Sequence, residues 1–260
     1  MDIVRYELNA ACATLTIDRP EKRNALNADL VDGLSSALRR AEEDAAARCV
    51  VITGTGKAFS AGADLDELRR LQGATPEENE ADSQRLADLF AQIYLHPKTV
   101  IARINGHALG GGCGLAAVCD LSIATNAARF GFPEVRIGIV PAIVSVFILR
   151  KLGDARARAL FLRGHVITAT QAVEYGLITS AVPESELDAA VDDLTAEIAG
   201  ETSGSAIGIT KRLLGDLQGL NLQDALAHAV DINTAARSTA DCRAGVEAFL
   251  QKRNPPWKRD

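Results

Sequence analysis

Glu134 is the residue whose surroundings most favour proton-transfer chemistry. It lies in residues 130–141, a run in which phenylalanine, valine, isoleucine and two prolines surround a single carboxylate. Burial disfavours the charged form of a carboxylate, so such a group can exchange protons near neutral pH. The competing interpretation is a glutamate that pairs with Arg136 or is solvated at a surface turn, as most glutamates are.

Two segments of small residues could supply backbone donors to a ligand. Residues 59–65 (Phe-Ser-Ala-Gly-Ala-Asp-Leu) follow an expected strand, and residues 105–114 carry three consecutive glycines before an expected helix. Small side chains leave the backbone N–H groups accessible, and the start of a helix favours negative charge. An ordinary turn at the first segment and close helix–strand packing at the second would also explain these residues.

The sequence does not contain a complete copy of three better-known motifs. Gly112, Gly114 and Ala117 fit the spacing of a dinucleotide fingerprint, but no strand that ends in an acidic residue follows at the expected distance. Lys57 is not preceded by a complete Walker pattern. Ser60 lacks the first glycine of a nucleophile elbow. A nucleotide-dependent dehydrogenase, a P-loop enzyme and an α/β-hydrolase are therefore all disfavoured.

Composition excludes further classes. The 260 residues carry a net charge of -6, which disfavours nucleic acid as a partner. No basic, apolar leader begins the chain, and the longest apolar stretch, residues 137–149, is too short to span a bilayer. The five cysteines are scattered and the four histidines lack metal-ligand spacing. We therefore expect a cytoplasmic protein without a metal or redox cofactor.

The elements that must position these residues follow an α/β pattern. Strands are expected over residues 3–8, 12–17, 50–53, 100–104 and 121–124. Helices are expected from the N-cap Asn27 to about 47, around 86–93 and over 115–118, and a loop over 73–79. Beyond about 185 helical spacing dominates, over 187–198, 206–214, 222–232 and 241–252. Residues 1–190 are predicted to form an α/β core, and residues 191–260 a helical region. With only 4% aromatic residues, the core should consist mainly of alanine, valine, leucine and isoleucine.

These motifs, in this order, resemble the crotonase superfamily of enoyl-CoA hydratases and isomerases. The resemblance covers residues 18–26, 60–65, 105–120, 133–141, 171–178 and 245–253. It implies a spiral of β-β-α units with a C-terminal helical trimerisation region, assembled as a homotrimer or a dimer of trimers. It also implies an acyl-CoA thioester as substrate, with no cofactor apart from the coenzyme A of that substrate.

The resemblance assigns roles to individual residues. The N–H groups of Ala63 and Gly111 would form an oxyanion hole for the thioester oxygen, where one donor is typically worth about 3 kcal/mol. Glu134 would be the acid/base. The other predicted substrate contacts are Arg23, Ala25, Ala61, Asp64, Leu65, Gly110, Gly114 and Pro141. Lys252 and Arg253 could approach the CoA phosphates, including those of a neighbouring subunit.

Gly114 departs from the family pattern. Hydratases commonly carry a first catalytic glutamate at this position, and glycine can neither hold a water nor move a proton. One possibility is hydration by Glu134 alone, which takes a proton from water and returns one on the same face. Another is an isomerase, which needs one base, and a third is an acyl-CoA-binding protein without activity. Gly114 would also enlarge the acyl pocket. Residues 134–145 are similar to hydratases of branched, carboxylated enoyl-CoAs, which can share this glycine, so hydratase is the first prediction.

Overall fold

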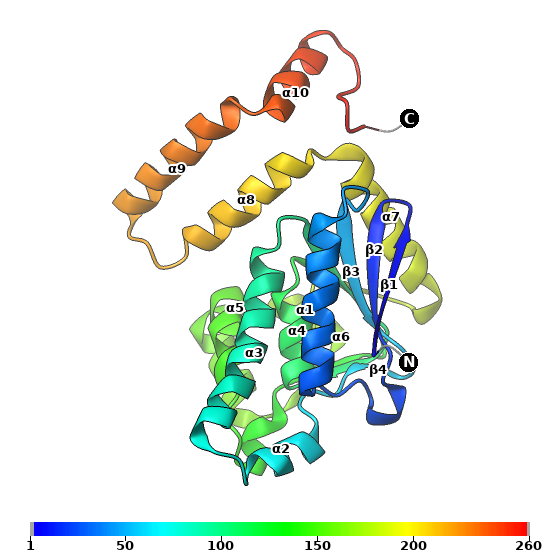
Figure 1. Cartoon of the computed structure of the whole chain (residues 1–260), viewed down its shortest axis with the longest axis vertical. Helices are drawn as coiled ribbons and strands as arrows, with labels where there is room; N and C mark the ends of the chain where they lie inside the picture. Colours follow the sequence, from blue (N-terminus) through cyan, green and yellow to red (C-terminus); the bar gives the residue numbers. More distant parts are fainter. Residues whose placement is uncertain (1–2, 259–260) are drawn as a thin grey trace.

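The computed structural model describes residues 3–258, which form two β-sheets surrounded by helices (Figure 1). The larger sheet has the strand order β1-β2-β3-β5-β7-β10 and the smaller one β4-β6-β8-β9. The larger sheet contains β1 Val4–Asn9, β2 Cys12–Ile17, β3 Cys49–Gly54, β5 Thr99–Ile104, β7 Leu121–Thr125 and β10 Ser180–Val182. The smaller sheet contains β4 Ala58–Ser60, β6 His107–Leu109, β8 Arg129–Gly131 and β9 Val166–Thr168.

The larger sheet confirms the five predicted strands. β1 and β2 are antiparallel, and Ala10 and Ala11 turn the chain between them with left-handed φ angles of 46° and 65°. The other neighbours pair in parallel. β3 is buried along its whole length, as expected for a valine- and isoleucine-rich strand that is covered on both faces.

Ten α-helices and three short 3-10 helices complete the described chain. The first five α-helices are α1 Ala28–Glu43, α2 Leu65–Leu71, α3 Pro76–Leu95, α4 Gly111–Val118 and α5 Ala142–Arg163. They are followed by α6 Ala169–Tyr175, α7 Leu187–Glu201, α8 Gly204–Asp216, α9 Leu222–Arg237 and α10 Ala240–Leu250. The 3-10 helices are η1 Pro20–Lys22, η2 Pro133–Ile137 and η3 Glu184–Glu186.

The two ends of α1 show how local chemistry decides where a helix begins and ends. Asn27 caps α1 as predicted, and its side chain accepts a hydrogen bond from the N–H of Leu30 at 3.1 Å. The helix ends earlier than expected because Asp44 is extended and its carboxylate accepts from the N–H of Ala46 at 2.9 Å.

The predicted loop over residues 73–79 is wrong in its second half. Thr75 caps α3 and forms a capping box with Glu78, and Pro76 occupies the first helical turn. Within a helix, proline is tolerated in the first turn and polar capping residues are favoured just before it, so they mark a helix start here. The region between residues 66 and 85 is therefore mostly helical and forms a wall beside the site described below.

The β-β-α units of the spiral divide their strands between the sheets. β3, β5 and β7 belong to the larger sheet, and each is followed by a short strand of the smaller sheet, β4, β6 or β8. Because β4, β6 and β8 run parallel, their carboxyl ends lie at the same edge. The segments that follow these three strands are 61–64, 110–111 and 132–134, which contain Ala63, Gly111 and Glu134.

The core is built mainly from small and branched aliphatic residues, as the composition predicts. Four of the seven phenylalanines are nevertheless fully buried, namely Phe59, Phe90, Phe130 and Phe132. Three of these four belong to the smaller sheet or the segment directly after it. The fully buried aromatic side chains are thus concentrated near the strands that carry the site.

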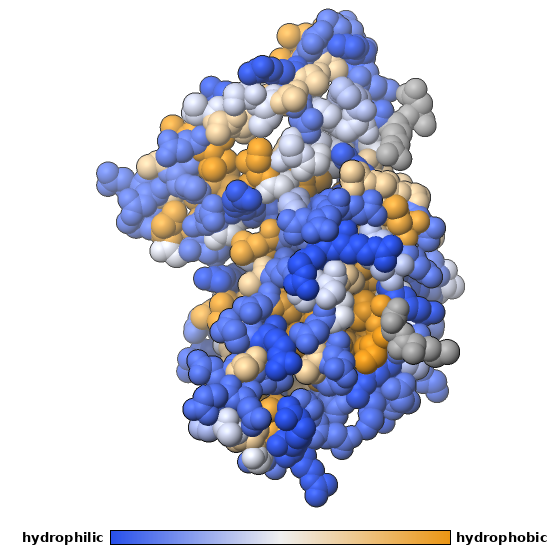
Figure 2. Space-filling view, in the orientation of Figure 1, coloured by the Kyte–Doolittle hydropathy of each residue, from blue (hydrophilic) through white to orange (hydrophobic). Residues whose placement is uncertain are grey.

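The last helices leave the body of the molecule. α7 packs against the larger sheet through Leu187, Val191 and Ile198. α8 is held to the body by Lys211, which pairs with Asp120 at 2.7 Å, and α9 and α10 extend away at the opposite end from α2 (Figure 1). These helices expose large apolar side chains, with Leu222 77% and Phe249 83% exposed. Figure 2 shows apolar residues reaching the surface in this part of the molecule.

Candidate active site

The segment after β4 holds the N–H of Ala63 toward a cavity. Leu26 donates its N–H to the carbonyl of Gly62 at 2.7 Å and accepts from the N–H of Asp64 at 2.9 Å. Since a peptide group is planar and trans, the Ala63 N–H points away from the Gly62 carbonyl and so away from residue 26. No hydrogen bond within residues 3–258 uses this N–H, and Ala63 is exposed at the cavity.

The segment after β6 brings a second backbone donor to the same place. Gly110 has φ 52° and ψ -128°, a conformation that side chains rarely adopt, and it turns the chain into α4. Gly111 is the first residue of α4, where an N–H has no partner within the helix and carries the positive end of the helix dipole. A Cβ on Gly62 would lie 3.2 Å from the Gly111 nitrogen, so the two segments are in close contact.

Glu134 occupies η2, which follows β8. Its Oε2 is buried and has no hydrogen-bond partner among the described residues. Burial raises the pKa of this carboxyl group above its ordinary value. A Cβ on Gly110 would lie 2.9 Å from Oε1, which places the carboxylate next to the start of α4. The alternative of a Glu134–Arg136 ion pair is wrong, because the ion pairs of residues 3–258 do not include one.

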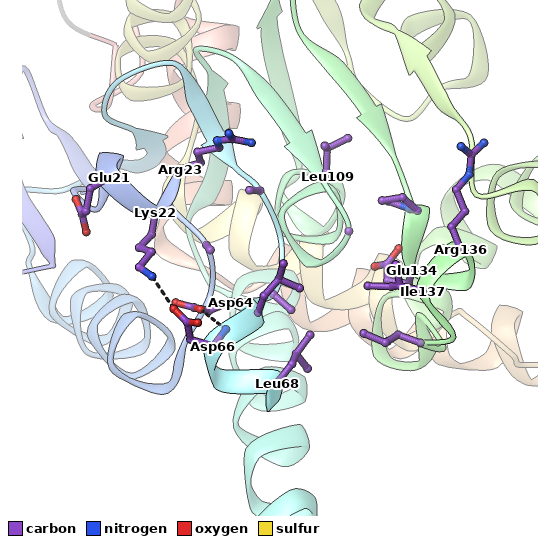
Figure 3. Close-up of a pocket in the computed structure, with 17 residues that line it drawn as sticks. Glu21, Lys22, Arg23, Asp64, Asp66, Leu68, Leu109, Glu134, Arg136 and Ile137 are labelled. Atoms are coloured by element: carbon purple, nitrogen blue, oxygen red, sulfur yellow. Dashed lines mark hydrogen bonds and ion pairs between the residues drawn. The ribbon is translucent and has the colours of Figure 1, made fainter. Parts of the chain in front are cut away.

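Ala63, Gly110 and Glu134 line a cavity of about 740 Å³. Glu134 and Ile137 face it from one side, and Asp64, Asp66 and Leu68 lie across from them (Figure 3). Lys22 pairs with Asp66 at 2.6 Å at the exposed margin. The cavity thus has a mixed lining, with charged residues at its margin and apolar side chains beside the carboxylate.

A second cavity of about 210 Å³ begins at the two backbone donors. Ala63 and Gly111 both line it, and Ala63, Asp64 and Leu68 also line the first cavity. It continues between α1 and α3, where Val31, Leu71, Leu86 and other side chains form its walls. The N–H groups of Ala63 and Gly111 therefore lie where the two cavities meet.

Most of the predicted site residues line the first cavity: the catalytic candidates Ala63 and Glu134, and the substrate contacts Arg23, Ala25, Ala61, Asp64, Leu65 and Gly110. Asp64 does so with a carboxylate that is already engaged. It pairs with Arg19 at 2.6 Å. It also accepts a hydrogen bond from the N–H of Asp66 at 2.9 Å, and in this way Asp64 caps α2. Although burial raises the pKa of Asp64, these contacts outweigh it and lower the pKa below its ordinary value.

The prediction that Gly114 enlarges the acyl pocket is wrong. Gly114 is buried and lines neither cavity. A Cβ there would lie 2.3 Å from Cγ1 of Val144 and 3.0 Å from Cε2 of Phe90. The space that the first glutamate would need is filled by α5 and α3. Pro141 also lines neither cavity; it precedes α5, beside Val140, which lines the second cavity.

The basic C-terminal residues lie away from this chain's own cavities. Lys252 and Arg253 follow α10, at the opposite end of the molecule from α2 (Figure 1). Arg253 pairs with Glu247 at 3.2 Å. Any contact of these residues with a CoA phosphate would have to be made to another subunit.

Arg19 and Asn24 are site-forming residues whose roles the sequence did not predict. Asn24 is fully buried, and its amide donates to the carbonyls of Thr55 and Ala58. Both residues belong to the 18–26 motif, so they could have been noticed, but the partners of Asn24 lie more than 30 residues away along the chain. Within residues 3–258 no group of acidic, histidine or cysteine side chains could hold a metal ion. No helix in this range is long and apolar enough to cross a membrane.

Two sheets joined in β-β-α units, with two backbone N–H groups beside a carboxylate whose Oε2 is buried, form the arrangement that the resemblance to the crotonase superfamily predicts. The sequence model of the enoyl-CoA hydratase/isomerase family matches residues 7–260, and the protein belongs to this family. A Thermus thermophilus protein that carries an enoyl-CoA hydratase name is 39% identical over 243 residues, 94% of this chain and 96% of its own.

Two further proteins that are similar to this chain also carry hydratase names. The 2,3-dehydroadipyl-CoA hydratase of Escherichia coli is 36% identical over 252 residues and covers 94% of both chains. The crystal structure of an enoyl-CoA hydratase from Shewanella pealeana superimposes with a TM-score of 0.93 at 30% identity. That match covers 98% of this chain and 96% of the other, so the crotonase fold extends over nearly the whole protein.

Proposed function

We propose that the protein is an enoyl-CoA hydratase that adds water across the 2,3 double bond of an enoyl-CoA thioester. One observation carries this proposal: three parallel strand ends bring two backbone N–H donors and one buried carboxylate to the same place. The arrangement suits a reaction in which negative charge develops on a thioester oxygen while a proton moves nearby.

The thioester oxygen would accept hydrogen bonds from the N–H groups of Ala63 and Gly111. When water adds to carbon 3, the electrons of the double bond move toward this oxygen and form an enolate. Both donors are held by the backbone before substrate arrives, so they need not reorganise as the charge develops. Preorganised donors of this kind usually contribute most to the stabilisation of an oxyanion.

Glu134 would handle both protons. Its ionised form takes a proton from the attacking water, whose oxygen bonds to carbon 3, and then returns a proton to carbon 2 of the enolate. The raised pKa of Glu134 suits both halves of this cycle, because it brings the carboxyl closer to the neutral range.

The packing around Gly114 supports a mechanism with one carboxylate. Val144 and Phe90 fill the space beside this residue, and no second carboxylate lies at the family's first glutamate position. The same observation favours a second candidate function. An isomerase that moves a double bond between the 3 and 2 positions needs one base only, and Glu134 could serve it.

The two cavities suggest how a substrate would lie. The larger cavity, which Arg23, Ala25 and Leu65 line, suits the pantetheine arm of CoA. The smaller cavity begins at the oxyanion donors and would take the acyl chain toward α3. The names of the relatives support an enoyl-CoA substrate, and a panel of substrates that differ in acyl length and branching would identify the acyl chain.

We also propose that the chain assembles as a homotrimer or a dimer of trimers. The exposed apolar side chains of α8, α9 and α10 support this, because contiguous apolar surfaces favour association. Leu222, Leu226 and Phe249 are prominent among them. In such an assembly Lys252 and Arg253 could reach the CoA phosphates of a neighbouring subunit.

The test is a panel of 2-enoyl-CoA and 3-enoyl-CoA substrates of different length and branching, with each product identified by mass. A hydratase adds the mass of one water to the 2-enoyl substrates. An isomerase converts the 3-enoyl substrates with no change in mass, which chromatography against standards would detect. Binding without turnover of any substrate would contradict both functions and favour a non-catalytic acyl-CoA-binding protein.

A further inference from the structure

Arg19 lies behind the oxyanion hole rather than in it. It follows β2 and lines neither of the two cavities. Its side chain is 16% exposed, and that of its partner Asp64 is 6% exposed. Exposed ion pairs contribute little to a structure, whereas a pair as enclosed as this one leaves an uncompensated charge when one partner is removed.

One nitrogen of the guanidinium connects two segments. Nη1 of Arg19 donates to the carbonyl of Ala25 at 2.9 Å and to Oδ2 of Asp64 at 2.6 Å. Ala25 and Asp64 immediately flank Leu26 and Ala63, the two residues that form an isolated parallel bridge. The guanidinium therefore binds to both strands of the bridge, through the residue before Leu26 and the residue after Ala63.

The bridge sets the direction of the Ala63 N–H. The hydrogen bonds of Leu26 to Gly62 and from Asp64 fix the two peptide planes that surround Ala63. The Ala63 N–H belongs to the Gly62–Ala63 plane, so a rotation of this plane would turn it away from the thioester oxygen, and the hydrogen bond from Asp64 holds the neighbouring plane against such a movement. Small errors in such geometry are costly, because a displacement of about 1 Å can reduce a rate about 10²-fold.

Arg19 is itself held in place from a third segment. Its N–H donates to Oδ1 of Asn24 at 3.0 Å, and its carbonyl accepts from the N–H of Asn24 at 2.9 Å. The amide of Asn24 donates in turn to the carbonyl of Thr55, just before β4, and to that of Ala58, the first residue of β4. Hydrogen bonds through Asn24 therefore connect β4 to the backbone of Arg19, from which the guanidinium extends.

We infer that Arg19 is a positioning residue for the reaction, which aligns the Ala63 N–H with the thioester oxygen through Asp64 and the Ala25 carbonyl. The inference rests on the proposed oxyanion role of Ala63. It assigns to the charge of Arg19 an effect on catalysis without any contact with substrate.

The test measures how strongly the bound thioester carbonyl is polarised. A saturated acyl-CoA with a ¹³C-labelled thioester carbonyl is bound to each variant, and its C=O stretch is recorded by difference infrared spectroscopy. In the wild type the band should move to lower frequency on binding. In Arg19→Ala we expect about half of this shift or less, with kcat lowered about 10- to 100-fold and KM changed only a few-fold. Arg19→Lys keeps the charge and should recover part of the band shift and part of kcat.

Arg103→Ala is the control for the loss of a carboxylate-paired arginine away from the site, in a pair whose carboxylate is mostly exposed. Arg103 also pairs with a carboxylate, that of Asp188, through Nε at 2.8 Å, but it lies on β5 and lines neither site cavity. Its removal should leave the band shift and kcat close to the wild-type values. If Arg19→Ala does not fold, Arg19→Lys provides the comparison, with its folding checked by thermal unfolding.

The outcomes separate this inference from the proposed function. If the wild type shows no band shift, the oxyanion role of Ala63 and Gly111 fails, and the inference fails with it. If the wild type shows the shift and both Arg19 variants keep it in full, only the positioning role of Arg19 is overturned. An equal loss of shift in Arg103→Ala would also overturn it, because the effect would then be general loosening.

Discussion

The two halves of the site are held in opposite ways. On one side, the backbone donors of Ala63 and Gly111 are fixed by hydrogen bonds, a buried ion pair and the start of a helix. On the other side, Glu134 lies in a short 3-10 helix, and its buried Oε2 has no hydrogen-bond partner within residues 3–258. The proposed oxyanion donors are thus surrounded by structural contacts, whereas the Oε2 of the proposed acid/base has no hydrogen-bond partner among the described residues.

The difference matches what the proposed mechanism requires of each half. A donor that stabilises an oxyanion works best when it is rigid before the substrate binds. A carboxylate that exchanges protons must be able to change its charge, and strong ion pairs would fix it in the ionised form. Asp64 and Glu134 illustrate this, because contacts lower the pKa of the first and burial raises the pKa of the second.

The largest effect is expected from removing the proton-transferring group. Glu134→Gln keeps the shape of the side chain but cannot accept a proton from water, so kcat should fall about 10²- to 10⁴-fold. Binding of a saturated acyl-CoA, measured by calorimetry, should change little because the oxyanion donors remain. A variant that retains most of its activity would show that another group moves the proton.

The next largest effect concerns one backbone donor. Gly111→Pro removes an N–H at the first position of α4, where proline is well tolerated, and should lower kcat about 10²- to 10³-fold. Gly111→Ala is the control, because it places a Cβ in the same contact with Leu26 but keeps the N–H. Steady-state kinetics compares the two, and circular dichroism checks that both fold. Equal activity of the two variants would contradict the role of this N–H.

A smaller effect concerns the packing of Gly114. Gly114→Glu restores the residue type common in hydratases, but its Cβ would lie 2.3 Å from Val144, and overpacking of this kind typically costs about 1–3 kcal/mol. We expect lower stability to chemical denaturation and no gain in kcat. Gly114→Glu combined with Val144→Ala should recover part of the stability. A single variant that is as stable as the wild type and more active would mean that this position opens into the cavity.

The smallest expected effect is on stability: Glu134→Gln should stabilise the folded protein at alkaline pH, whereas most substitutions destabilise a protein. Because the pKa of Glu134 is raised in the folded state, the folded protein binds more protons than the unfolded chain between the two pKa values. Its stability therefore decreases as pH rises through this window, and Glu134→Gln removes that loss. Thermal unfolding should show a higher Tm for the variant at pH 8, with the difference shrinking toward about pH 4, near the pKa of an unperturbed glutamate. A variant that is less stable at pH 8 would show that the ionised carboxylate has a partner after all.

The sequence predicted five of the six strands of the larger sheet, most helices and the three groups of the candidate site, but not the short strand β10. It could not predict the smaller sheet, because β4, β6, β8 and β9 have three residues each and show no periodicity. It also could not predict how Gly114 packs, since Val144 approaches it from a helix 30 residues further along the chain. Residue types revealed which groups could react, and the parallel pairing of short strands revealed why they meet.

Glu134 acting alone should deliver both parts of water to one face of the double bond. Hydration of a 2-enoyl-CoA in D₂O, followed by NMR analysis of the 3-hydroxyacyl product, measures this most directly. We expect the new oxygen at carbon 3 and the deuterium at carbon 2 to lie on the same face in nearly all product molecules. Addition to opposite faces, or a mixture of the two, would contradict a mechanism with a single carboxylate.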